Sequence, residues 1–143
     1  MTTILILDDN PVVLRMLGLV LGSKAGYRVI ESGTESDAVS QIEQHLPDIK
    51  LLVADVCVDG EPGRTVAARL TKRCPHLRVL FISGYPHDHL IANGWLQPDD
   101  AFLAKPFSPD RLIRRVNEVL AVSPQQHSVS TGALRTACAG GAP

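Results

Sequence analysis

The sequence lacks the features that mark membrane-spanning, secreted and nucleic-acid-binding proteins. No apolar stretch approaches the ~20 residues that a helix needs to cross a bilayer. The N-terminus enters an apolar run directly, without the charged segment that begins a signal peptide. The formal net charge is −1 and there is no basic run, so direct nucleic-acid binding is not indicated. We therefore expect a cytoplasmic protein that acts without membrane or nucleic acid.

Cysteine is scarce, and its spacing does not indicate a metal site. Cys57, Cys74 and Cys138 are an odd number and lack the close pairing of zinc ligands. We interpret them as free thiols in a reducing compartment. No internal repeat is visible, and 143 residues have room for about one domain. With 45% hydrophobic and 20% charged residues, the composition is ordinary for a globular protein.

Five short apolar runs separated by segments of helical period predict an α/β protein. The runs are continuous rather than alternating, as in strands that are buried on both faces of a parallel sheet. We expect strands near residues 4–7, 27–30, 49–54, 78–82 and 101–104. Helical stripes of apolar residues fall between residues 13–21, 38–46, 66–74 and 112–120. This alternation predicts helices on both faces of the sheet, with right-handed crossovers.

The stretch between the fourth and fifth predicted strands is less regular. Pro86, Gly94 and Pro98 interrupt it, so any helix there is short. His87 and His89 could suggest a metal, although two histidines beside a proline are more often the end of a solvated loop. The apolar residues of this stretch either close over the core or form a partner surface, and their periodicity leaves both open.

Capping residues mark the starts of the first and last predicted helices, and a change in composition marks the end of the domain. Asn10 before a proline is a plausible helix N-cap, and Ser108 or its neighbours can cap the last helix. The pattern ends after Val122. Residues 123–143 are rich in small and polar residues, so we predict a domain over 1–122 and a disordered tail too short for an output domain.

Four of the apolar runs end on side chains that can carry chemistry. They break at Asp8 and Asp9, at Asp55, at Ser83 and at Lys105. Because ligands of open parallel sheets bind outside the carboxyl ends of the strands, we expect these five side chains to converge. At about 4 Å, two carboxylates repel by ~4 kcal/mol at an effective dielectric near 20, which a bound cation relieves. Oxygen ligands in an open cleft suit Mg²⁺.

Such a set can support phosphoryl transfer to a carboxylate. The carboxylate attacks phosphorus to form an aspartyl phosphate, while magnesium and the ammonium neutralise the phosphoryl oxygens. The hydroxyl can donate a hydrogen bond to one of these oxygens afterwards. Each residue alone could be an ordinary strand-end residue, so the prediction depends on their joint occurrence. The spacing does not say which aspartate attacks.

The sequence resembles the receiver domain of two-component response regulators over residues 3–122. The matching segments are LILDDN at 5–10, LLVADV at 51–56, FISGY at 81–85 and FLAKPF at 102–107. The resemblance implies a flavodoxin-like (βα)5 fold with a doubly wound parallel sheet of strand order 2-1-3-4-5, here with a short or irregular fourth helix. The last two segments are similar to those of receivers fused to hybrid sensor kinases.

The resemblance also implies roles for the acidic residues. Asp55 would be the phosphoacceptor. Asp8 and Asp9 would hold magnesium together with Asp55, and Asp9 is the expected direct ligand of the acidic pair. The backbone carbonyl of Cys57 would complete the protein ligands. The phosphoryl donor would be a histidine kinase or a histidine phosphotransfer protein.

Further roles follow from the resemblance on the other strands. Ser83 would be the switch hydroxyl, Lys105 the phosphate-binding lysine and Phe102 the aromatic switch residue. The Lys105–Pro106 peptide bond would be cis, which is the minority isomer in proteins generally. By the resemblance, the chain is not an enzyme beyond its own phosphorylation and dephosphorylation.

Three departures from the family pattern stand out. We expect a loop from Val56 to Pro62, which is rich in turn residues. In it Asp59 occupies the usual proline position and proline appears instead at Pro62, which adds a charge near the site and could reshape the loop. Phe102 lacks the phenol hydroxyl and could signal only by packing. Gly94 and Pro98 erode the fourth helix, so we expect a monomer or a weak dimer.

The main functional hypothesis is a phosphoacceptor signalling domain without a DNA-binding output domain, which switches an unknown downstream partner. Some alternative functions also involve phosphorylation of the domain, and one does not. The domain could be a phosphorelay intermediate, a phosphate sink or the terminal receiver of a hybrid kinase. It could be a pseudo-receiver that binds partners without phosphorylation. A magnesium-dependent aspartyl-phosphate phosphatase is a remote alternative, since the D-x-D motif and cap domain of haloacid-dehalogenase-like enzymes are missing.

Overall fold

The computed structural model describes residues 2–45 and 47–122, in which strands and helices alternate. The elements are β1 (Thr3–Leu7), α1 (Pro11–Gly18), the π-helix η1 (Leu19–Lys24), β2 (Arg28–Ser32), α2 (Glu35–His45), β3 (Ile49–Asp55), β4 (Cys57–Val58), β5 (Glu61–Pro62), α3 (Gly63–Arg73), β6 (Arg78–Ser83), α4 (His87–Ala92), β7 (Phe102–Ala104) and α5 (Pro109–Ala121). The predicted disordered tail and Cys138 lie outside the described residues.

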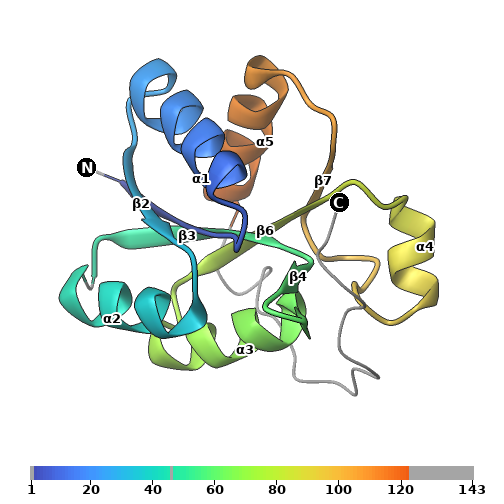
Figure 1. The fold of residues 1–143 in the computed structure, drawn as a ribbon. Helices are drawn as coiled ribbons and strands as arrows, with labels where there is room; N and C mark the ends of the chain where they lie inside the picture. Colours follow the sequence, from blue (N-terminus) through green and yellow to red (C-terminus); the bar gives the residue numbers. More distant parts are fainter. Residues whose placement is uncertain (1, 46, 123–143) are drawn as a thin grey trace.

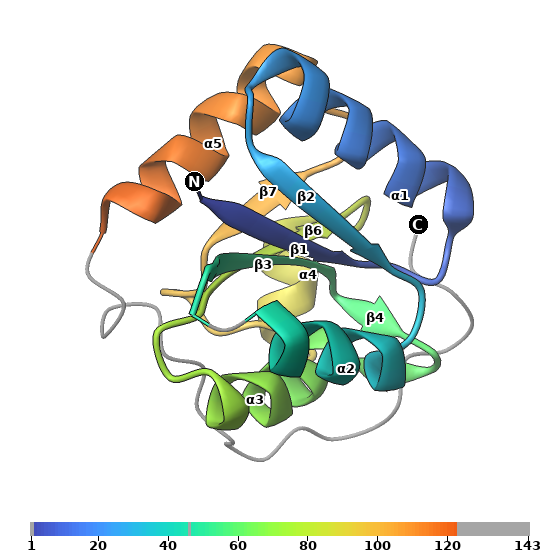
Figure 2. The ribbon, with the colours of Figure 1, turned by 90° about the vertical axis from the view of Figure 1, so that its left-hand side faces the viewer.

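Five parallel strands form the central sheet in the order β2-β1-β3-β6-β7. Counted along the chain without the small hairpin, this is the predicted order 2-1-3-4-5. Helices α1 and α5 cover one face of the sheet and α2 and α3 the other, while α4 lies beyond the β7 edge (Figure 1 and Figure 2). The predicted flavodoxin-like fold is therefore confirmed.

The continuous apolar runs are explained by burial on both faces. All five residues of β1 are buried, and the four apolar ones alternate between two cores. Ile4 and Ile6 pack with residues of α1 and α5, whereas Leu5 and Leu7 pack with residues of α2 and α3. A strand with two buried faces has no place for the alternate polar residues of a half-exposed sheet. Beyond the end of the strand the side chains are no longer buried on both faces, so polar residues can occur there.

Capping side chains fix the start of two helices, as the sequence predicted. The Asn10 carboxamide oxygen accepts hydrogen bonds from the backbone N–H groups of Val12 (2.9 Å) and Val13 (3.4 Å) at the start of α1. The Ser108 hydroxyl accepts one from the N–H of Arg111 (3.1 Å) at the start of α5. Each bond satisfies a helix N–H that has no intrahelical acceptor. Asn10 therefore sets where α1 begins, directly after the acidic pair.

Residues 57–62 form an antiparallel hairpin, where the sequence was interpreted as a loop. Cys57 pairs with Pro62, and Val58 pairs with Glu61. Between these strands Asp59 has a φ of 51° and Gly60 a φ of 78°. Two central residues with positive φ define a type I′ turn, for which Asp-Gly is a favoured pair. Asp59 at the proline position is thus a turn residue.

Helix α4 has only six residues, as expected from the prolines and glycine around it. Leu90 and Leu96 are buried in the core, so the apolar residues of this stretch help to close it. The solvated-loop interpretation is wrong for His87, which begins α4 and stacks on Phe102 with ring centroids 5.1 Å apart. No helix among the described residues is long and apolar enough to span a membrane.

Candidate functional site

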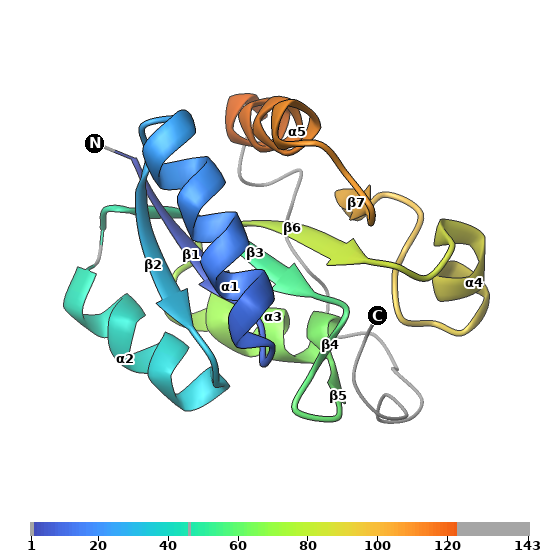
Figure 3. The same ribbon diagram turned by 45° about the horizontal axis from the view of Figure 1, so that its top comes forward.

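The polar residues at the carboxyl ends of β1, β3, β6 and β7 lie at one edge of the sheet. The parallel register aligns Leu7 with Ala54, Asp55 with Ile82, and Ser83 with Ala104. The polar residues are therefore staggered: Asp55 is level with Ile82, so Ser83 lies one position further on, and Lys105 lies one position beyond Ser83. Figure 3 shows the N-terminal end of α1 and the β4–β5 hairpin at this edge. The predicted convergence of strand ends is thus present in the backbone.

Asp55 and Lys105 form the centre of the site. The Lys105 Nζ lies 3.3 Å from the Asp55 Oδ2, and the Asp55 Oδ1 accepts a hydrogen bond from the backbone N–H of Cys57 at 3.2 Å. The Asp55 side chain is 3% exposed and that of Lys105 is 19% exposed. Burial raises the pKa of Asp55 to about 7, although the charge of Lys105 opposes this, and the nearby Asp8 carboxylate adds to it. The ammonium therefore stabilises a carboxylate that burial disfavours.

Asp8 is a second buried carboxyl group beside Asp55. Its Oδ1 accepts a hydrogen bond from the backbone N–H of Asn10 at 2.8 Å. Its Oδ2 is buried and has no hydrogen-bond partner within the described residues. Burial also raises the pKa of Asp8, while the Asn10 N–H and the Lys105 charge lower it. An unsatisfied carboxylate oxygen is costly, and a divalent cation beside two carboxylates would relieve that cost. These residues fit Mg²⁺.

Asp9 lies at the rim of the site. Its side chain is exposed, and its Oδ2 accepts a weak hydrogen bond from the backbone N–H of Asp59 at 3.4 Å. Over residues 2–45 and 47–122, no three His, Cys, Asp or Glu side chains are grouped to hold a metal by themselves. The structure thus brings Asp8, Asp55 and Lys105 together and leaves Asp9 at the rim, where its charge still raises the pKa of Asp8. As a metal ligand Asp9 stays a prediction, as does the Cys57 carbonyl.

Ser83 lies at the end of β6, next to Lys105. It is fully buried, and its carbonyl accepts the backbone N–H of Lys105 at 2.8 Å. Its hydroxyl accepts the N–H of Tyr85 at 3.0 Å and, within the described residues, donates no hydrogen bond.

Phe102 links the site to α4 and α5. The ring is partly buried and stacked on His87 at an interplanar angle of 19°, and its carbonyl accepts a hydrogen bond from the Arg115 Nε at 3.2 Å. The Lys105–Pro106 peptide bond is cis. The His87 Nε2 is buried without a hydrogen-bond partner among the described residues. No local pattern predicts the stack, because it depends on how α4 packs beside β7.

Two further residues beside Asp55 were missed from the sequence. Gly63 donates its N–H to the Val56 carbonyl at 2.6 Å, and a Cβ on Gly63 would lie 2.0 Å from the Asp55 carbonyl oxygen. The next residue, Arg64, is 3% exposed and pairs with Asp100 at 2.7 Å. The Pro62-Gly63 dipeptide signalled a turn, but nothing in the sequence distinguished Arg64 from a surface arginine.

The comparisons with known proteins agree with this arrangement. The model of the family described as "Response regulator receiver domain" matches residues 4–117. The chain belongs to the response regulator receiver domain family. The predicted identification is thereby confirmed.

Two curated relatives show where such a domain occurs. The chain is 31% identical over 118 residues to the sensor kinase CckA of Brucella abortus (strain 2308), covering 82% of this chain and 12% of that protein. It is 33% identical over 119 residues to the transcriptional activator protein ExaE of Pseudomonas putida, covering 82% of this chain and 55% of that protein. The receiver thus spans about half or less of either relative.

Solved structures support the same fold. A putative response regulator from Chloroflexus aurantiacus J-10-fl is 35% identical and has a TM-score of 0.70. The match covers 85% of this chain and 98% of that one. The CheX-CheY-BeF3-Mg²⁺ complex from Borrelia burgdorferi is 23% identical, with a TM-score of 0.69, covering 82% of this chain and 88% of that one. The second likeness concerns the fold alone.

Proposed function

We propose that this receiver domain accepts a phosphoryl group on Asp55 in a magnesium-dependent reaction. The donor would be the phosphohistidine of a histidine kinase or of a phosphotransfer protein. One observation carries the proposal: the buried Asp55 carboxylate lies 3.3 Å from the Lys105 ammonium, beside an Asp8 oxygen that lacks a partner among the described residues. As a nucleophile, Asp55 would then lie between the Lys105 ammonium and the Asp8 carboxyl group, whose oxygen, unpaired within that part of the chain, favours a bound cation.

The side chains divide the reaction among themselves. An ionised Asp55 oxygen attacks phosphorus, and the bond from phosphorus to the donor imidazole nitrogen breaks with its electron pair leaving on that nitrogen. Lys105 then pairs with a phosphoryl oxygen, and the Ser83 hydroxyl donates a hydrogen bond to another. Asp8 and Asp55 would hold magnesium, which when bound would neutralise the charge on the phosphoryl oxygens. The chain would catalyse only its own phosphorylation and dephosphorylation.

Phosphorylation would act as a switch through Ser83 and Phe102. A hydrogen bond from Ser83 to the phosphoryl group favours one of two conformations, and the equilibrium shifts by that difference in binding energy. Phe102 has no hydroxyl, so it can respond only by changing its packing. Its stack on His87 links that change to α4. The partner surface that changes would then lie near β7 and α4.

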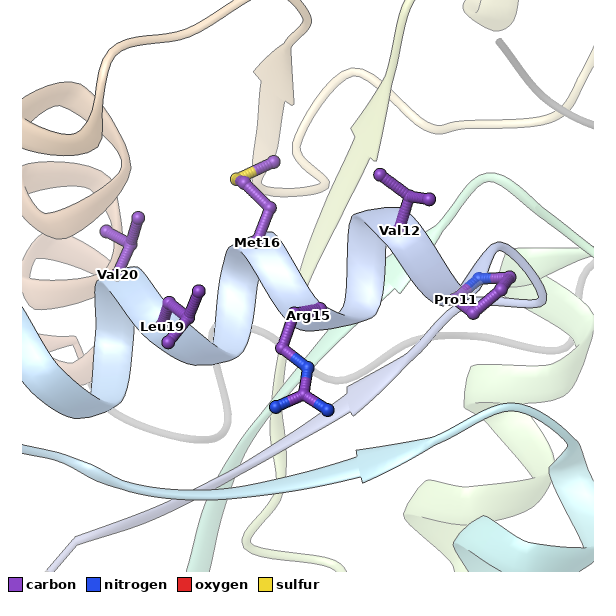
Figure 4. A pocket seen from close by; sticks show the side chains of 6 residues that line it. All are labelled: Pro11, Val12, Arg15, Met16, Leu19 and Val20. Atoms are coloured by element: carbon purple, nitrogen blue, oxygen red, sulfur yellow. The ribbon is translucent and has the colours of Figure 1, made fainter.

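An exposed apolar patch on α1 supports a protein donor. Val12, Met16 and Leu19 are 75%, 39% and 56% exposed. Together with Pro11 and Arg15, these three line an open surface pocket of about 550 Å³, and Figure 4 shows their side chains along α1 and, for Leu19, at the start of η1. Exposed apolar patches of this kind mark protein interaction sites. Since α1 begins directly after the acidic pair, a donor bound here would reach Asp55.

The proposal is tested by phosphorylation with a small donor. Incubation with phosphoramidate and Mg²⁺ should add one phosphoryl group, detected by intact mass. Asp55→Asn, or removal of Mg²⁺ with a chelator, should abolish the addition. An unmodified wild-type protein would leave the pseudo-receiver alternative, and turnover of a generic phosphomonoester would revive the phosphatase.

A second candidate role is a relay intermediate or the terminal receiver of a hybrid kinase. The similarity to a sensor kinase favours it, because that protein carries a matching segment within a longer chain. Incubation of the phosphorylated protein with a histidine phosphotransfer domain separates the roles. Transfer of the phosphoryl group supports the relay, and its retention supports the output role. Both roles imply a cytoplasmic protein.

A further inference from the structure

A buried ion pair outside the site joins the two segments that supply Asp55 and Lys105. The Arg64 Nε lies 2.7 Å from the Asp100 Oδ2, and the two side chains are 3% and 8% exposed. At the C-terminal end of the same helix, α3, Arg73 pairs with Glu43, and these two side chains are 52% and 60% exposed. Solvent screens exposed pairs, whereas a buried pair holds its partners firmly because separating them leaves a charge in a dry environment.

On one side, Arg64 is fixed to the end of β3. The preceding residue, Gly63, donates its N–H to the Val56 carbonyl at 2.6 Å. It lies so close to the Asp55 carbonyl that a Cβ would meet the oxygen at 2.0 Å. The first turn of α3 therefore cannot move without moving the backbone of Asp55.

On the other side, Asp100 is fixed to the segment that carries Lys105. Its Oδ2 also accepts the backbone N–H of Gln97 at 2.8 Å, which closes the turn before β7. Strand β7 then pairs with β6, and the Lys105 N–H donates to the Ser83 carbonyl at 2.8 Å. Only Ala101 and the short strand β7 separate Asp100 from Lys105. A displacement of Asp100 would therefore also displace the backbone of Lys105.

We propose that Arg64 is a positioning residue, which through Asp100 holds the Lys105 ammonium within reach of the Asp55 carboxylate. Two ion pairs thus connect the same two segments: Asp55 with Lys105 in the site, and Arg64 with Asp100 outside it. During phosphoryl transfer Lys105 turns to a phosphoryl oxygen, and the Arg64–Asp100 pair keeps the backbone of Lys105 in place. Small displacements of a reacting group slow catalysis strongly. The inference rests on the proposed phosphorylation of Asp55.

The test compares Arg64→Met with Arg73→Met, which removes an exposed ion pair from the same helix. Phosphorylation is measured with saturating phosphoramidate and Mg²⁺, at a temperature at which circular dichroism shows each variant fully folded. We expect the rate constant of Arg64→Met to fall at least tenfold and that of Arg73→Met to change less than twofold. If Arg64→Met only lowers Tm, and the folded protein reacts at the wild-type rate, Arg64 is structural and the inference is overturned. Should Arg64→Met not fold, Asp100→Asn takes its place.

A second measurement does not depend on phosphorylation. A double-mutant cycle between Arg64→Met and Lys105→Met is read from urea unfolding without any phosphodonor. Independent sites add to within about a factor of two in the unfolding equilibrium constant. We expect a coupling of at least fivefold, and additivity would overturn the inference. If the wild type takes up no phosphoryl group while the cycle shows coupling, the proposed function fails and the positioning of Lys105 stands.

Discussion

The backbone of Gly63 lies against the carbonyl oxygen of Asp55, and a Cβ on Gly63 would meet that oxygen at 2.0 Å. We predict that Gly63→Ala destabilises the protein by roughly 1–3 kcal/mol, because the backbone at Asp55 must move to relieve the overlap. The same movement should slow phosphorylation of the protein that remains folded. Urea unfolding and intact mass after reaction with a small donor check the two effects.

A matched glycine gives the control for this prediction. A Cβ on Gly22 would lie 3.7 Å from the Val29 Cγ2, which is an ordinary contact. Gly22→Ala should therefore leave stability unchanged or raise it, since it lies in a helical segment. Equal losses from the two substitutions would contradict the close approach at Gly63.

The raised pKa of Asp55 predicts how stability depends on pH. Burial raises this pKa from 3.8 to about 7, so between these values the folded protein binds more protons than the unfolded chain. The free energy of unfolding contributed by Asp55 therefore falls as pH rises through this window, by at most about 4 kcal/mol. Urea unfolding at pH 5 and pH 7.5, without magnesium, measures the change.

The contribution of Asp55 is isolated by comparing variants. Asp55→Asn should reduce this fall in stability to the part that the raised pKa of Asp8 contributes, while Asp99→Asn, at an exposed aspartate, should leave the fall unchanged. Saturating Mg²⁺ should also reduce the fall in the wild type, because a bound cation stabilises the ionised carboxylate. A pH dependence in Asp55→Asn as large as that of the wild type would show that other carboxyl groups cause it.

The strand-end residues could be predicted because one physical rule applies at each of them. A strand that is buried on both faces must be apolar up to its end, so the first polar residue marks the carboxyl end of the strand. This holds for Asp8, Asp55, Ser83 and Lys105. Parallel pairing then brings these strand ends to one edge of the sheet. The strand order and the short α4 followed from the resemblance and from the breakers around that helix.

The contacts that the sequence did not reveal are those between residues far apart in the chain. Arg64 and Asp100 are 36 positions apart, and an arginine on a helix gives no sign that it will be buried. The stack of His87 on Phe102 depends likewise on the packing of α4. The hairpin is different, because the Asp59-Gly60 pair was a local signal for a type I′ turn that the interpretation as a loop passed over.

The hairpin turn can be tested apart from the charge that Asp59 adds. Gly60 has a φ of 78°, so Gly60→Ala should cost about 1 kcal/mol of stability. Asp59→Gly keeps the turn and removes the carboxylate, so its stability should stay within about 0.5 kcal/mol of the wild type. Urea unfolding measures both. A large loss in Asp59→Gly would mean that the side chain itself holds the hairpin.

The apolar patch on α1 should matter for a protein donor and not for a small one. Leu19 is 56% exposed, and Leu19→Glu would place a charge in the proposed contact. Transfer from a phosphorylated histidine kinase or phosphotransfer domain should fall at least tenfold, while phosphorylation by phosphoramidate stays unchanged because the site is intact. Ser36→Glu, at an exposed position on α2, is the control and should change neither rate. If Leu19→Glu left transfer from every competent protein donor at the wild-type rate, the donor would have to bind elsewhere.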